Sequence, residues 1–353
     1  MASILPLVLL AMAAPAWAHG RGSDATNYRS TLTDEAGVAG LEWRIWGNDE
    51  YLGLTNTTGE EVVIYGYQPT DPEEYLRIGP DGAFENRNST AYYLNLDRYA
   101  RQAPPEGTGA DVEPDWVKVS DAPSWAWHDH RIHWMGLSPP PQVQADPAAR
   151  TPVNSWQVPY RHAGSDHAVT GELEWVPPTS PIPWVAVAVA VVGVPALLGL
   201  RTQPQESSWP GLARPAALVL GVIAAANLIH LVDDLVATPT PLTTRLIAAV
   251  QTVLFIGIGI FGAVRAWQAR EGAFTALGVG AGSIFVGQGL LYVSVLGSSQ
   301  VASVFPAALT KGVVAFSLAQ ALPLGIVAVL GTRRLFATVP DARDEEAGAP
   351  AVG

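Results

Sequence analysis

The latter half of this 353-residue chain is a succession of long apolar runs, a pattern that fits few folds other than a helical membrane domain. A helix needs about 20 consecutive apolar residues to cross the hydrocarbon core of a bilayer. Runs of suitable length follow Pro183 at 184–200, 215–236, 246–264, 274–296 and 307–330. We therefore expect an all-α membrane domain of five transmembrane helices at 184–332 and a polar cytoplasmic tail at 333–353.

The region before these runs has the periodicity of a β domain. Short segments alternate apolar and polar residues, and clusters of Gly, Asn, Asp and Pro separate them. Strands at such short spacing indicate an antiparallel sandwich or barrel. We expect an all-β extracytoplasmic domain at 19–176, followed by a proline-rich tether at 177–183. The expected strands are 41–46, 51–55, 61–67, 75–78, 83–85, 91–94, 116–119, 125–134, 155–158 and 168–175.

The first 18 residues are typical of a secretory signal peptide. An apolar stretch at 4–14 precedes Ala16-Trp17-Ala18, which has the small-residue pattern of a cleavage site. The positive charge that usually precedes such a stretch is missing, and an uncleaved anchor is the alternative interpretation. Cleavage after Ala18 would make His19 the N-terminal residue of the mature protein.

The charges around the apolar runs predict the orientation of the protein in the membrane. With five spans and an exported N-terminal domain, the C-terminus lies in the cytoplasm. Cytoplasmic segments of membrane proteins carry an excess of Lys and Arg. The expected cytoplasmic segments carry Arg201, Arg214, Arg265, Arg270, Arg333 and Arg334, and the expected outer ones carry Arg245 and Lys311. We therefore expect a multi-pass protein of the cell membrane with its N-terminal domain outside.

Charge and cysteine content exclude several classes of function. The net charge is −12, and residues 19–183 alone carry 11 basic and 24 acidic side chains, a balance of −13. An acidic exported domain argues against nucleic acid as a partner, because nucleic-acid binding needs basic surfaces. The chain contains no cysteine, which excludes disulfides, thiolate metal sites, iron–sulfur clusters and cysteine nucleophiles.

Three of the seven histidines lie within six residues, at His128, His130 and His133, in a stretch rich in tryptophan. On an extended strand, alternate side chains share a face, so His128 and His130 could both bind one metal ion. His133 has the wrong parity for that face unless the strand ends or bulges. Imidazole is a good ligand for zinc, copper, nickel and iron. The alternative is a set of hydrogen-bonded histidines on an aromatic-rich strand.

An N-terminal His19 would offer its α-amine and its ring nitrogen to the same metal ion. One further imidazole would complete a three-nitrogen histidine brace, an arrangement that copper(II) accepts. The alternative is that the cleavage site merely precedes a histidine. His162 and His167 fall in a predicted turn, where histidines are usually solvated.

A second polar group lies within the second apolar run, at Asn227, His230, Asp233 and Asp234. Positions 227, 230 and 234 share one face of a helix, and charged groups inside a membrane are costly. We expect either a metal-relay or proton site here, or aspartates that lie in water and pair with Arg245. Gln251, Gln288 and Gln320, in the later runs, could join such a site or link helices.

The layout resembles a group of uncharacterised exported membrane proteins of high-GC Gram-positive bacteria. The residues that carry the likeness are His19-Gly20 and the segments 26–28, 54–59, 75–77 and 127–135. His19 at a processed N-terminus also resembles the start of the CopC-type periplasmic copper-binding proteins. That resemblance implies a β-sandwich in which the terminal histidine is a copper ligand.

Together these features predict a membrane-anchored extracytoplasmic metal-binding protein that handles copper through His19 and the His128–His133 stretch. Its expected partners are membrane lipid and an envelope protein or a copper-accepting protein. The alternative is a structural or interaction protein of the cell envelope without a metal site. A copper-dependent oxidative enzyme is the least favoured reading, because nothing in the sequence marks a substrate groove.

Overall fold

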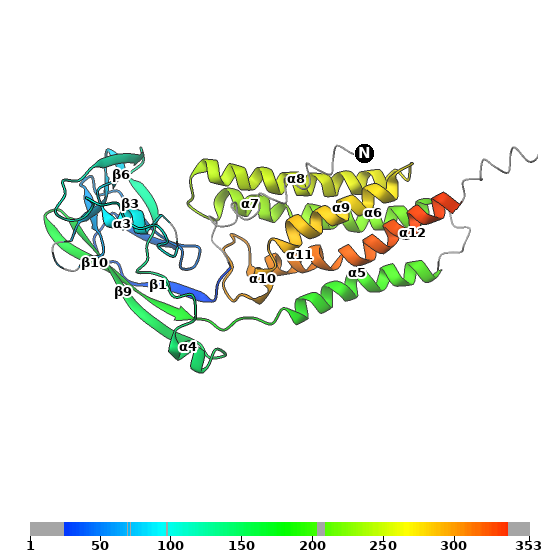
Figure 1. Cartoon of the computed structure of the whole chain (residues 1–353), viewed down its shortest axis with the longest axis horizontal. Helices are drawn as coiled ribbons and strands as arrows, with labels where there is room; N and C mark the ends of the chain where they lie inside the picture. Colours follow the sequence, from blue (N-terminus) through cyan, green and yellow to red (C-terminus); the bar gives the residue numbers. More distant parts are fainter. Residues whose placement is uncertain (1–24, 69, 71, 97, 203–208, 338–353) are drawn as a thin grey trace, which may run out of the picture. The chain divides into compact units, whose positions relative to one another are not determined.

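The computed structural model describes residues 25–68, 70, 72–96, 98–202 and 209–337, which form two compact units (Figure 1). The β-rich unit contains the described residues up to Thr179 together with Asp233–Arg245 and Gly297–Val304. The helical unit contains Ser180–Val232, Leu246–Leu296 and the chain from Phe305 onward. The predicted signal peptide, His19 and most of the predicted tail lie outside the described residues.

Two antiparallel sheets make up most of the β-rich unit. The larger has the strand order β1-β10-β9-β4-β5-β6-β7, and the smaller has the order β2-β3-β8. The strands are β1 (Tyr28–Asp34), β2 (Leu41–Trp46), β3 (Tyr51–Asn56), β4 (Val62–Tyr65), β5 (Glu74–Gly79), β6 (Gly82–Asn86), β7 (Trp116–Ser120), β8 (Ser124–His128), β9 (Thr151–His162) and β10 (Ser165–Trp175), with short helices α3 (Thr90–Leu94) and α4 (Pro141–Ala145).

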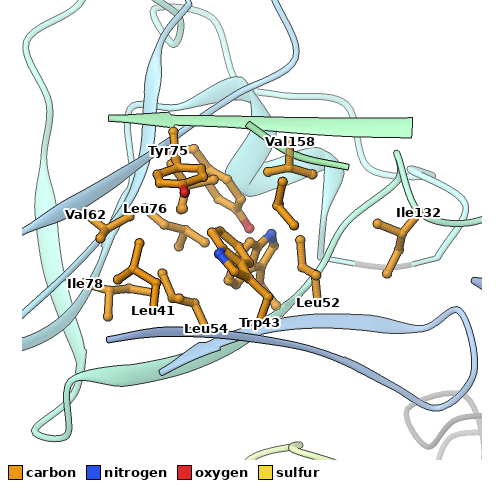
Figure 2. Packing of buried hydrophobic residues seen from close by; sticks show 14 of the residues in the cluster. Leu41, Trp43, Leu52, Leu54, Val62, Tyr75, Leu76, Ile78, Ile132 and Val158 are labelled. Carbon is orange, nitrogen blue, oxygen red and sulfur yellow. The ribbon is translucent and has the colours of Figure 1, made fainter. Parts of the chain in front are cut away.

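The period-two alternation explains how the sheets pack. Leu52 and Leu54 share one face of β3, and both are buried against side chains of the larger sheet (Figure 2). Trp43 of β2 meets Tyr160 of β9 with ring centroids 5.2 Å apart, so the inner faces of the two sheets are in direct contact. The prediction of an antiparallel β domain is confirmed, and its form is a sandwich.

Two predictions within this unit need correction. The segment 91–94, predicted as a strand, lies in helix α3. The buried carboxylate of Glu73 accepts hydrogen bonds from the backbone N–H groups of Thr90 (2.8 Å) and Ala91 (2.9 Å). It thereby satisfies the first turn of the helix, whose N–H groups have no partner inside the helix itself.

Strand β1 was not predicted, because its sequence is largely polar. It pairs with β10, and its Ser30 hydroxyl accepts a 2.7 Å hydrogen bond from the Trp156 indole.

The helical unit is built from apolar helices, as predicted. Within the part of the chain that the structure describes, four segments are long and apolar enough to cross a membrane: Gly211–Val236, Leu242–Trp267, Ala273–Leu290 and Ala307–Arg333. The first predicted span falls in α5, and a count of five spans remains a prediction. The helices are α5 (Ile182–Thr202), α6 (Trp209–Ala226), α7 (Leu228–Val236), α8 (Leu242–Trp267), α9 (Ala273–Ile284), the π-helix η2 (Phe285–Leu290), α10 (Ser294–Gly297), α11 (Ala307–Ala319) and α12 (Ala321–Ala337).

The sandwich core provides a direct test of the fold. Leu52→Ala should lower the free energy of unfolding by about 2–5 kcal/mol, because it leaves a cavity between the sheets. The control is Val117→Ala on β7, where the side chain is exposed. We expect its effect to stay within about 0.5 kcal/mol. Urea unfolding of the full chain in detergent, followed by tryptophan fluorescence, measures both. Equal losses would contradict the packing.

Candidate metal centre

Strand β8 ends at His128, which pairs with Tyr51 of β3. The chain then turns, and the Ile132 N–H donates to the Asp129 carbonyl over 3.2 Å. The prediction that the strand continues to 134, with His128 and His130 on one of its faces, is therefore wrong. The turn removes the strand parity that would have separated His133 from the other two histidines.

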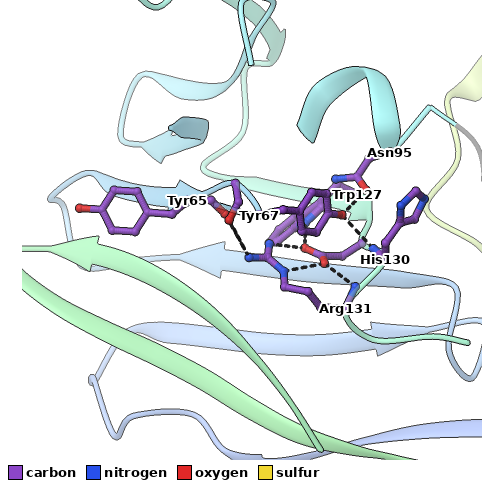
Figure 3. A network of polar contacts seen from close by, with 8 residues as sticks. Tyr65, Tyr67, Asn95, Trp127, His130 and Arg131 are labelled. Carbon is purple, nitrogen blue, oxygen red and sulfur yellow. Dashed lines mark hydrogen bonds and ion pairs between the residues drawn. The ribbon is translucent and has the colours of Figure 1, made fainter. Parts of the chain in front are cut away.

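A buried ion pair fixes this turn. The fully buried Asp129 carboxylate accepts hydrogen bonds from Arg131 Nε (2.8 Å), Arg131 Nη2 (2.7 Å) and the Trp127 indole N–H (2.8 Å) (Figure 3). Burial opposes ionisation of the carboxyl, but Arg131 and these hydrogen bonds hold the pKa of Asp129 below its ordinary value. The Arg131 guanidinium also donates to the Tyr65 and Gly66 carbonyls, at 3.2 Å each, which attaches the turn to the larger sheet.

Tyr67 fixes the middle histidine of the turn. Its hydroxyl accepts a hydrogen bond from the His130 backbone N–H over 3.0 Å, and it donates to Asn95 Oδ1. The Tyr67 ring stacks on the His130 imidazole with centroids 6.0 Å apart and planes 12° apart. The orientation of His130 is therefore set by contacts from outside its own turn.

The result is a cluster of three imidazoles. One ring nitrogen from each of His128, His130 and His133 lies within 4.8 Å of the others. Ring centroids are 4.8 Å apart for His128 and His133, 5.2 Å for His130 and His133, and 5.5 Å for His128 and His130. Among the residues that the structure describes, no other group of three or more His, Asp or Glu side chains is placed to hold a metal ion.

Unsatisfied nitrogens distinguish this cluster from ordinary buried histidines. His128 is 8% exposed and His133 is 3% exposed. His128 Nε2 and both ring nitrogens of His133 are buried without a hydrogen-bond partner. A buried polar group without a partner costs about 1–3 kcal/mol. A shared cation would satisfy one nitrogen from each ring at once.

A carboxylate behind His128 orients its ring. Glu50 Oε1 lies 3.3 Å from His128 Nδ1, and Nε2 of the same ring is buried without a partner. Glu50 in turn pairs with Arg98, and Arg98 Nη2 lies 2.6 Å from Asp49 Oδ2. A carboxylate behind a ligating histidine is the usual arrangement around protein-bound metals. Burial raises the pKa of the Asp49 carboxyl, and the Arg98 guanidinium opposes that shift.

The environment keeps two of the rings neutral. Burial, the neighbouring His130 and the Arg98 guanidinium lower the pKa of His128 to about 3. Burial, Arg98 and the other two imidazoles lower the pKa of His133 to about 2. Metal ions bind the unprotonated imidazole. These two rings are therefore ready to act as ligands at neutral pH.

The cluster is open on one side. His130 and His133 line a hollow of about 640 Å³, together with Trp134, Met135 and residues 154–157 of β9. A second hollow, of about 320 Å³, is lined by Glu50, Arg98 and Ala25, the first described residue. Trp134 and Gly136 line both hollows, so the two adjoin each other beside the cluster.

The remaining predicted residues lie elsewhere. His162 Nε2 is 3.1 Å from the Thr58 hydroxyl, and the His167 ring stacks on Tyr160, so neither joins the cluster. Glu50 and Arg98 were not predicted. Glu50 lies directly before β3, the strand that pairs with β8, and this position in the sequence could have indicated that Glu50 comes close to His128.

The predicted membrane group is distributed between the two units. In the helical unit, Asn227 bonds to the Ser317 hydroxyl (2.9 Å), and the His230 and Tyr292 ring centroids are 4.1 Å apart. In the β-rich unit, Asp233 accepts hydrogen bonds from the Ser303 hydroxyl (2.7 Å) and the Val304 N–H (2.9 Å). Arg245 donates to the Leu235 carbonyl at 2.9 Å, and Asp234 follows Asp233 on α7.

Comparisons with known proteins leave the chemistry of this centre to be inferred from its own geometry. No protein-family model matches the chain, and neither a curated protein nor a solved structure is detectably similar to it.

The buried ion pair generates the first prediction for this site. Arg131→Met should destabilise the protein by about 3–5 kcal/mol, because it leaves the Asp129 charge buried without a partner. The control is Arg150→Met, which breaks the Arg150–Glu174 pair at the surface and should cost about 1 kcal/mol or less. Urea unfolding of the full chain measures both. A loss no larger for Arg131→Met than for the control would contradict the assigned role.

The lowered pKa values of His128 and His133 predict how stability depends on pH in metal-free buffer. Histidines in the unfolded chain titrate near 6.5, so below this pH the unfolded state binds more protons than the folded state. The contribution of these rings to stability is complete above about pH 6.5 and is lost as pH falls toward their folded-state pKa values. Unfolding curves between pH 7.5 and 5 should show a steeper loss for the wild type than for a His128→Gln, His133→Gln double variant. Parallel pH profiles would refute the prediction.

Proposed function

We propose that the protein is a membrane-anchored extracytoplasmic metal-binding protein that handles copper. The observation that carries the proposal is the convergence of His128, His130 and His133, with ring nitrogens of His128 and His133 that are buried without a partner. All three donors are nitrogens, and affinity for divalent first-row metals at such sites is highest for copper. The Glu50 carboxylate beside His128 Nδ1 also favours a cation bound by that ring.

A processed N-terminus would add two more nitrogen ligands. Ala25 lines the same hollow as Glu50, whose carboxylate contacts His128. Six residues of extended chain reach about 20 Å, so an N-terminal His19 has enough chain to approach the cluster from this side. The resemblance of His19 to the terminal ligand of CopC-type proteins agrees with this arrangement.

The openness of the cluster favours exchange over permanent storage. His130 and His133 border a hollow that is open to solvent, so a metal ion could leave without unfolding the domain. This suits binding followed by delivery to a copper-accepting partner at the membrane. An envelope structural or interaction protein remains the competing function, and the experiment below separates the two.

The membrane topology of the proposal has two supports. The connections Asp233–Arg245 and Gly297–Val304 belong to the β-rich unit, and both are expected on the outer side. The apolar helices follow the positive-inside bias when the β-rich unit is outside. We propose that this unit faces outward and that the C-terminus is cytoplasmic.

Copper(II) binding by the full chain, purified in detergent with its native N-terminus, tests the function. His128→Ala and His133→Ala should each remove one nitrogen from the hyperfine pattern of bound copper and abolish the high-affinity phase of its titration. Glu50→Gln should weaken binding about 10–100-fold, because it removes the group that orients a ligand. His167→Ala, in the β9–β10 hairpin, is the matched control and should have no effect.

A second arm separates the brace from a site made by the three clustered histidines alone. One additional residue placed before His19 blocks the amine, and it should weaken copper binding as much as His19→Ala does. Unchanged affinity in both variants would leave the three-histidine site as the correct description. Unchanged affinity in every histidine variant would replace metal binding with the interaction-protein function.

A further inference from the structure

Three helices of the helical unit are interrupted inside their apolar segments. Asn227 separates α6 from α7, Gln320 separates α11 from α12, and residues 285–290 form the π-helix η2. The N–H groups of Asn227 and Gln320 keep their helical hydrogen bonds to Ile223 (3.2 Å) and Phe316 (3.1 Å), so these two breaks are local, whereas at η2 the Leu291 N–H donates to the Val286 carbonyl, five residues back. Inside a membrane such interruptions are tolerated where protein or a hydrated cavity surrounds them, and π-turns are frequent at functional sites.

The interruptions carry buried polar side chains. Asn227, Gln288 and Gln320 are all 0% exposed. Asn227 Nδ2 donates to the Ser317 hydroxyl over 2.9 Å, and Gln320 Nε2 donates to the Ala281 carbonyl over 2.9 Å. Each interruption therefore places an amide side chain between helices, at a position where an apolar side chain would be expected.

Contacts bring the interruptions to one region. A Cβ at Gly289 would lie 3.3 Å from the Leu318 backbone nitrogen, so η2 touches α11 directly beside Ser317. Tyr292, one turn beyond Gln288, meets the His230 ring at a centroid distance of 4.1 Å. His230 in turn lies one helical turn from Asn227. We call this set, Asn227, His230, Gln288, Tyr292, Ser317 and Gln320, the intramembrane polar site.

Several atoms of this site are buried without a protein partner. They are His230 Nε2, both amide atoms of Gln288 and Gln320 Oε1. The set contains donors as well as acceptors. Among the described residues of the helical unit, only Glu271 is acidic, and it lies in the connection between α8 and α9. Asp233 and Asp234 follow His230 by three and four residues on α7, but the Asp233 carboxylate already accepts hydrogen bonds from the Ser303 hydroxyl and the Val304 N–H. Water can both donate to and accept from the unpartnered groups of the site.

We infer that the intramembrane polar site binds ordered water, with His230 Nε2 and the Gln288 amide as its principal ligands. The helical unit then holds a hydrated imidazole inside the membrane, a group that can exchange protons with its bound water. This site is independent of the histidine cluster in the β-rich unit, and its test does not depend on copper binding.

Water-edited solid-state NMR of the full chain in lipid bilayers, with ¹⁵N-labelled glutamine, tests the inference. Loss of one side-chain resonance in Gln288→Leu identifies the Gln288 amide. Magnetisation from water should reach it several-fold faster than it reaches the Gln251 backbone amide, which lies within α8. The exposed Gln142 side chain is the positive control. Transfer to Gln288 as slow as to the Gln251 backbone would overturn the proposal.

A second variant tests the imidazole. His230→Phe keeps a ring beside Tyr292 and removes Nε2, so transfer from water to Gln288 should slow. Unchanged transfer would remove His230 from the site. The thermal stability of Gln288→Leu is an independent test. If the site is hydrated, the substitution removes a hydrogen-bond partner of the water and destabilises the protein. If the site is dry, it removes an unsatisfied buried amide and stabilises the protein. Stabilisation would overturn the inference.

Discussion

The arrangement of the β-rich unit around its histidines depends on the ion pair between Asp129 and Arg131. A carboxylate with no exposure to solvent is stable there because a guanidinium and an indole N–H surround it. The pair holds a turn at the end of β8, and that turn places His128, His130 and His133 around one point. A regular strand would have pointed His133 to the opposite face. The site therefore depends on a charge pair that contributes no ligand of its own.

The candidate centre and the intramembrane polar site follow the same physical logic. Each collects buried polar atoms whose desolvation no protein group compensates. In the candidate centre the unsatisfied atoms are nitrogens of His128 and His133, with the Glu50 carboxylate at His128, and such a donor set suits a metal ion. In the intramembrane polar site they are the Gln288 and Gln320 amides and the His230 imidazole, which include donors as well as acceptors and suit water. The difference in donor set assigns different occupants to the two sites.

Much of this organisation could be predicted from local sequence, because period-two alternation and long apolar runs are local signals. The failures occurred where a distant residue decides the local structure. Glu73 makes a helix of a segment that was predicted as a strand, by capping it from another part of the sheet. The histidine cluster was predicted by composition, but its geometry depends on Asp129, and its second layer on Glu50 and Arg98. Glu50 comes close to His128 only through the pairing of β3 with β8.

The pairing of β1 with β10 has a consequence for any ligand that the N-terminal segment supplies. Because β1 begins at Tyr28, nine residues, 19–27, would precede this strand as an N-terminal arm if the mature protein begins at His19, as proposed. An arm of this length confines its end to a small volume, which corresponds to an effective concentration in the millimolar range. Binding of its end to a metal ion at the cluster would be an intramolecular chelation, which does not depend on protein concentration. Lengthening the arm would weaken this chelation gradually, although every contact to the metal ion would be kept.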